Sequence, residues 1–121
     1  MKRIVLATLA TITLSGCMAD TEQDMKDALL CSGVAMELAT RDRENSQDWA
    51  RYRTTLFTIG TDLVDEVYST KEEKVTFLET FDEQVPRYLK DTKNTPNGVL
   101  TQAWVEHRCE ELTLAYGMEQ Q

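Results

Sequence analysis

Helix-breaking residues are scarce in this chain, which holds five glycines and two prolines among its 121 residues. The stretches between these breakers place apolar side chains three and four residues apart, the spacing of one face of an α-helix. No run of any length alternates apolar and polar residues as a half-buried strand would. We therefore expect an all-α fold, with helices at about residues 21–41, 47–68, 70–89 and 96–116.

Two of these helices have recognisable start signals. Thr70 followed by Glu73 forms a capping box, which begins the third helix. Pro86 interrupts that helix, but the apolar residues keep their phase beyond it, so we expect a kink rather than an end. For the fourth helix, Thr95 is the expected N-cap and Pro96 the first helical residue.

The first 17 residues have the layout of an export signal. A basic start at positions 2 and 3 precedes an apolar run that is shorter than the roughly 20 residues needed to span a bilayer. The quartet Leu14-Ser15-Gly16-Cys17 resembles the lipobox of bacterial lipoproteins. That resemblance implies removal of residues 1–16 and lipid attachment at Cys17, and Met18 after the cysteine implies the outer membrane. The alternative is ordinary cleavage after Ala19, which would leave a soluble periplasmic protein.

The resemblance divides the chain into three parts. Residues 1–16 form the lipoprotein signal peptide, residues 17–23 a lipidated tether, and residues 24–121 one helical domain. An extended tether of this length, at about 3.6 Å per residue, reaches about 20 Å. We therefore expect the domain to stay close to a membrane, on the periplasmic side.

Acidic residues dominate the expected mature chain. Removing residues 1–16 takes away two basic residues and no acidic one, which leaves 11 basic against 21 acidic residues and a net charge of −10. Nucleic acid is excluded as a partner, because phosphate binding needs a basic surface. Either the acidity only maintains solubility, or it attracts a basic protein.

Two cysteines, Cys31 and Cys109, remain once Cys17 carries lipid. An even pair in an exported protein predicts a disulfide, whereas a redox or metal site would need a C-x-x-C spacing or companion histidines. Short connections between the four helices favour an antiparallel up-down four-helix bundle. In that order both cysteines lie roughly 12–15 Å from the same end, so the disulfide would join the first and last helices.

Groups able to perform catalysis are few. His107 is the only histidine, and Glu110 and Glu111 follow it at the spacing of a carboxylate–imidazole pair on one helix face. No nucleophile, metal-ligand cluster or phosphate-binding glycine loop accompanies it. Glycoside cleavage by a pair of carboxylates is an alternative that the sequence leaves open, because so acidic a chain contains such pairs by chance. We expect a protein that is not an enzyme and that holds no metal or cofactor.

A candidate binding face lies on the fourth helix. Its apolar stripe includes Leu100, Trp104 and His107, and the flanking acids form a rim of Glu106, Glu110 and Glu111. One interpretation is that neighbouring helices bury the stripe. The other is that part of it stays exposed and binds a partner protein or a second copy of the chain.

Three functions are compatible with these patterns. The first is an outer-membrane-anchored periplasmic protein that binds another protein, such as an inhibitor of a basic cell-wall-active enzyme. In size, export and single disulfide the domain is loosely similar to small helical periplasmic immunity proteins. The second is a structural accessory lipoprotein of an envelope assembly or secretion machine. The third, a small-molecule carrier, would use Met25, Met36, Phe77 and Phe81, which are more simply core residues.

Overall fold

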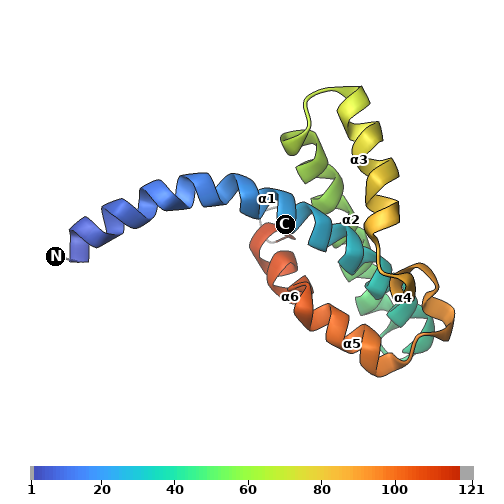
Figure 1. Cartoon of the computed structure of the whole chain (residues 1–121). Coiled ribbons are helices and arrows are strands. Elements are labelled where there is room, and N and C mark those ends of the chain that lie inside the picture. Colours follow the sequence, from blue (N-terminus) through green and yellow to red (C-terminus); the bar gives the residue numbers. More distant parts are fainter. Residues whose placement is uncertain (1, 118–121) are drawn as a thin grey trace.

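The computed structural model describes the backbone of residues 2–117 and, within that range, all side chains except those of residues 2–20, 88 and 117. This part of the chain is mainly helical and contains no strand, which confirms the all-α prediction. Two long helices, α1 (Lys2–Arg41) and α2 (Ser46–Val67), pack side by side as a hairpin (Figure 1). The other elements are α3 (Lys71–Gln84), α4 (Arg87–Lys90), the 3₁₀ turn η1 (Thr92–Asn94), α5 (Asn97–Glu106), α6 (Cys109–Leu112) and the π-helical turn η2 (Thr113–Gly117).

Helix α1 begins much earlier than the sequence predicted. Its backbone runs from Lys2 through the predicted signal peptide and through the predicted tether of residues 17–23. The side chain of Cys17 lies outside the described residues, and lipid attachment there stays a prediction. Within the described part of the chain, no helix is both long and apolar enough to cross a membrane.

The hairpin of α1 and α2 contains a close approach at Gly60. The buried residues of α2 follow a helical spacing along the face that meets α1: Leu56, Ile59, Gly60, Leu63 and Val64. A Cβ atom placed on Gly60 would lie 2.6 Å from Leu29 Cδ2 and 2.8 Å from Leu29 Cγ. A larger residue at position 60 would therefore displace the Leu29 side chain.

A disulfide joins α1 to α6, as the sequence predicted. Cys31 and Cys109 are fully buried, and their Cα atoms are 5.5 Å apart. The larger core cluster surrounds this bond and includes Met25, Leu56 and Phe77. A smaller cluster of Val34, Leu38, Leu100 and Ala103 joins α1 to α5. The C-terminal segment is thus attached to α1 both covalently and by apolar packing.

The predicted capping box is confirmed, but the predicted kink is wrong. Thr70 Oγ1 accepts from the Glu73 N–H, and the Glu73 carboxylate accepts from the Thr70 N–H. Helix α3 ends at Gln84, because Val85 is extended, as the residue before a proline prefers. Pro86 instead stands before the short helix α4.

The predicted fourth helix starts later and breaks in its middle. Pro96 is the N-cap of α5, while the Thr95 hydroxyl donates to the Asp91 carbonyl rather than capping the helix. Arg108 has φ 54° and ψ 39°, the left-handed conformation, and it separates α5 from α6. A non-glycine residue in this region costs about 1–3 kcal/mol and needs surrounding contacts to hold it there.

Replacing Gly60 with alanine tests the close approach of α1 and α2. We expect Gly60→Ala to lower the free energy of unfolding by about 1–3 kcal/mol, because the new methyl group displaces Leu29. The matched control is Gly33→Ala in α1, where a new Cβ meets no atom within 4 Å. That change should stabilise the protein by about 0.5–1 kcal/mol through helix propensity. Urea unfolding measures both, and a stabilising Gly60→Ala would contradict the close approach.

Removing the disulfide tests how much it contributes to stability. The bond closes a loop with a sequence separation of 78. We expect the double variant Cys31→Ala/Cys109→Ala to lose about 4–5 kcal/mol of unfolding free energy, because its unfolded chain is no longer cross-linked. Reduction of the wild-type protein should produce a similar loss. A loss below about 1 kcal/mol in urea unfolding would show that the apolar clusters alone hold the C-terminal segment.

Candidate functional site

The predicted binding stripe on the fourth helix faces α1 for much of its length. Leu100 is fully buried in the cluster with Val34 and Leu38, so its side chain offers no surface to a partner. Trp104 and His107 are half-buried. The three acids of the predicted rim, Glu106, Glu110 and Glu111, are exposed. Whether any of these residues binds a partner stays a prediction.

Trp104 belongs to an aromatic cluster between α2 and α5. Its ring meets Trp49 edge to face at 5.0 Å between centroids, and meets Tyr52 in the same manner at 5.1 Å. Such edge-to-face pairs contribute about 0.5–1.5 kcal/mol beyond their buried area. The Trp49 indole N–H also donates to Asp42 Oδ2 at 3.1 Å. Trp104 therefore has a structural role in packing α5 against α2, whether or not its exposed part also contacts a partner.

A hollow borders this aromatic cluster near the turn between α1 and α2. Its lining combines apolar and polar side chains: Leu38, Arg41, Asp42, Trp49, Asn97, Thr101 and Trp104. Much of the polar lining is already engaged within the protein, since Arg41 donates to Asn97 Oδ1 at 2.8 Å and Asp42 accepts from Trp49. The candidate carrier residues do not converge here, because Met25 and Phe77 are buried in the other core cluster and Met36 is exposed.

Arg41 fastens the segment between α4 and α5 to the end of α1. Its guanidinium donates to the carbonyls of Thr92 and Thr95, and it pairs with Glu37 at 3.0 Å. Glu37 also accepts from the Thr92 hydroxyl at 2.9 Å. Burial raises the pKa of Glu37, but these hydrogen bonds outweigh it and lower that pKa overall. The sequence offered no sign of this arrangement, because the partners of Arg41 in η1 and α5 are 51 to 56 residues away.

His107 pairs with an acid on α1, not with the glutamates on its own helix. His107 Nδ1 lies 2.9 Å from Asp27 Oδ1, and Asp27 is 3% exposed. The break at Arg108 ends α5 just after His107, so the regular spacing toward Glu110 and Glu111 is lost. The imidazole therefore contacts a carboxylate 80 residues away along the chain, and not Glu110 or Glu111 as the sequence suggested.

Arg108 extends this contact into a polar network beside the disulfide. Its guanidinium donates to Asp24 at 2.7 Å and to Asp27 at 3.0 Å, and the Tyr116 hydroxyl donates to Asp24 at 2.7 Å. These bonds to the two acids raise the pKa of Arg108 above its ordinary value. Burial, together with the bond to Asp24, raises the pKa of Tyr116 to about 12. The network therefore holds the left-handed turn at Arg108 in place.

Asp27 is the most buried charge of this network. Burial raises its pKa, but hydrogen bonds from His107, Arg108 and Gln23 favour the carboxylate, and the net effect is a lowered pKa. Every buried polar side-chain atom among the described residues has a hydrogen-bond partner. The network is therefore saturated within the protein, as expected for a structural cluster.

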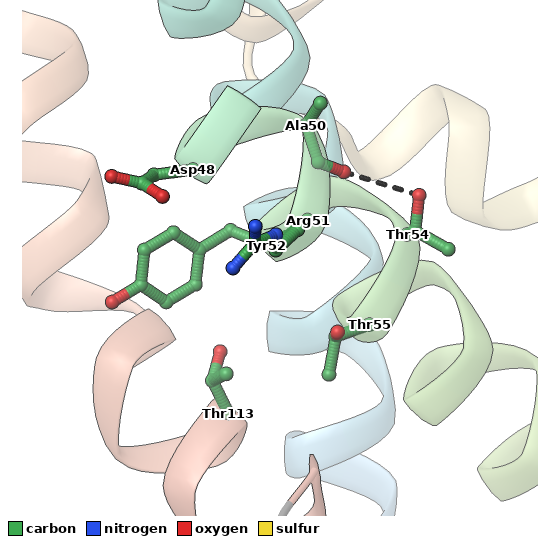
Figure 2. Close-up of a pocket in the computed structure, with 7 residues that line it drawn as sticks. All are labelled: Asp48, Ala50, Arg51, Tyr52, Thr54, Thr55 and Thr113. Carbon is green, nitrogen blue, oxygen red and sulfur yellow. Dashed lines mark hydrogen bonds between the residues drawn. The ribbon is translucent and has the colours of Figure 1, made fainter. Parts of the chain in front are cut away.

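An open pocket lies between α2 and η2 (Figure 2). Figure 2 shows Thr113 directed toward the ring of Tyr52, and Thr54 donating to the Ala50 carbonyl at 3.1 Å. The other residues that line this pocket are Asp48, Arg51 and Thr55. No group of three or more His, Cys, Asp or Glu side chains suited to a metal ion occurs in the described part of the chain.

The lowered pKa of Asp27 predicts how stability changes in acid. A carboxyl group whose pKa is lower in the folded state stabilises the fold above its unfolded pKa, near 3.8, and this contribution disappears as pH falls through the folded pKa. We expect Asp27→Asn to lose about 2–4 kcal/mol at pH 7 and to flatten the fall in stability below about pH 4. The control Asp62→Asn, at an exposed position of α2, should change neither. Denaturant unfolding at pH 2–7 measures the effect. If the unfolding free energy of Asp27→Asn falls below pH 4 as steeply as that of the wild type, the network is contradicted.

No protein-family model, curated protein or solved structure matches this chain. The function proposed below is therefore inferred from the chain's own residues and their arrangement.

Proposed function

We propose that this chain is a lipid-anchored protein of the bacterial outer membrane whose helical domain binds a basic protein in the periplasm. Cys17, in the lipobox-like quartet, would carry the lipid. The observation that carries the binding role is the charge of the surface. Among the residues of known exposure, fifteen acidic side chains are exposed against eight basic ones. Such a surface attracts basic macromolecules over distances of about a Debye length.

A binding role is favoured over catalysis by how the polar groups are used. The single histidine is held by Asp27, and the buried acids Asp24 and Asp27 are neutralised by Arg108. These groups fix the C-terminal segment on α1, and among the described side chains no buried acid or base is left unpaired for chemistry. We propose that the protein is not an enzyme and works without metal or cofactor.

The concrete form of the proposal is inhibition of a basic cell-wall-active enzyme. The loose similarity to helical periplasmic immunity proteins, in size, export and single disulfide, supports this form. A basic hydrolase would approach an acidic surface rapidly, because opposite charges steer the encounter.

The alternative is a structural accessory lipoprotein of an envelope assembly or secretion machine. It is favoured by the continuous backbone of α1, which includes Cys17 and reaches the domain without a break. At 1.5 Å per residue, the seven residue steps from Cys17 to Asp24 span about 10 Å. A domain held so close to its membrane would meet membrane-embedded neighbours.

We also infer the up-down order of the helices as part of this proposal. In this order α5 and α6 together act as the fourth helix of an antiparallel bundle. The 5.5 Å between the Cα atoms of Cys31 and Cys109 supports it, because both cysteines are then at the same level of the bundle.

Mild-detergent co-purification of the full-length chain from its native envelope tests the proposal. We expect a basic, cell-wall-active enzyme to be recovered in stoichiometric amount and to lose activity when it is bound. Recovery of membrane-embedded machine components instead would favour the accessory role, and recovery of neither would contradict protein binding. The control Cys17→Ser should move the chain from the membrane fraction to the soluble fraction. A chain that stays in the membrane fraction would contradict the lipid anchor.

A further inference from the structure

Helix α3 is held to the rest of the protein through one edge. Phe77 is its only buried residue, and that ring packs between Tyr68 and Phe81 with centroid distances of 5.2 Å to each. Figure 1 shows α3 on the outside of the hairpin, with α2 as its neighbour and free space on its other side. The remaining surface of α3 is therefore available to a partner.

Apolar side chains are exposed on α3. Val75 and Leu78 stand one turn apart on α3 and are 44% and 53% exposed. Exposed apolar residues grouped on one face are typical of interaction surfaces, whereas single ones need no explanation.

Acidic residues surround these apolar side chains. Residues 62–83 contain eight acids, all exposed, and two lysines. One of the lysines, Lys74, is paired with Asp65 at 2.8 Å. Glu79 and Asp82 follow Val75 at spacings of four and seven residues, which places them on the same face of α3. The face thus combines an apolar centre with a negative rim.

An exposed apolar face can bind a second copy of the chain, a membrane or another protein, and the negative charge of the rim favours one of these. A second copy of the chain would bring two acidic faces together, and like charges in an interface oppose association. Anionic headgroups of a membrane are repelled for the same reason. A helix with apolar residues on one side and Lys or Arg beside them satisfies both the apolar centre and the rim.

We infer that the free face of α3 is the docking surface for the basic partner, with Val75 and Leu78 as the apolar contacts and Glu79 and Asp82 as acceptors for its Lys or Arg side chains. This inference rests on the proposed function and places its site on α3, away from Trp104. The packing explains that location, because Leu100 is buried and Trp104 is held by Trp49 and Tyr52.

Photo-crosslinking in the native envelope tests this surface. A photoreactive amino acid replaces Leu78 in the full-length chain, and a second variant carries it at Val105, which is 71% exposed on α5 and serves as the matched control. We expect the variant at Leu78 to form an adduct with a basic protein, at a yield at least about tenfold higher than the variant at Val105. Equal melting temperatures would show that both variants fold.

Reversing the charge of the acidic rim is the second test of this surface. In the chain labelled at Leu78, the pair Glu79→Lys and Asp82→Lys should reduce the adduct about tenfold or more. The matched pair Glu110→Lys and Glu111→Lys, exposed on α6, should change it less than about twofold. An equal loss from both pairs would show attraction to net charge alone and overturn the inference.

The remaining outcomes separate the surface from the function. An adduct of Leu78 with a second copy, with lipid or with an acidic protein overturns the inference. So does a basic partner that co-purifies with the chain but forms no adduct at Leu78, and in that case the proposed function stands. If no basic protein co-purifies and none is crosslinked at either position, the proposed function fails together with the surface.

Discussion

The ion pairs that Arg108 makes with Asp24 and Asp27 hold the architecture together. A left-handed residue in the middle of a helical segment is unfavourable, and here two buried carboxylates on α1 compensate for it. The turn redirects the chain so that Cys109, the next residue, reaches Cys31, and Tyr116 reaches Asp24. Covalent, ionic and apolar contacts therefore fix the same segment to the same part of α1.

Acidic residues have two different roles in this protein. Asp24 and Asp27 are buried and structural, and each is balanced by hydrogen bonds from the C-terminal segment. Breaking such a buried pair by removing one partner costs more than an exposed pair is worth, because the remaining charge has no solvent. The acids of α2 and α3, in contrast, are exposed, and apart from Glu73 in the capping box they affect stability little. Their excess over basic residues is the property on which the proposed binding of a basic protein rests.

Stability is unevenly distributed between the elements. The disulfide, the Arg108 network and the Arg41 contacts all join α1 to the C-terminal half of the chain, while α3 contributes one buried ring to the core. Elements with few buried contacts open most readily, and binding surfaces are often drawn from them. The lightly packed acidic helix α3 is therefore the element on which the proposed binding role places its surface.

Local patterns in the sequence determined the helical class and the capping box at Thr70, because helical period and capping involve residues only three or four positions apart. The pairing of Cys31 with Cys109 followed from the number of cysteines, since only these two remain once Cys17 carries lipid. The lipobox-like quartet likewise stands on adjacent residues. Tertiary structure alone decided that Val75 and Leu78 are exposed while Leu100 is buried, since the periodicity of a helix shows which residues share a face but not what covers it. It also decided that His107 pairs with Asp27 and that Arg108 breaks the last helix, because each depends on a partner about 80 residues away that local sequence cannot reveal.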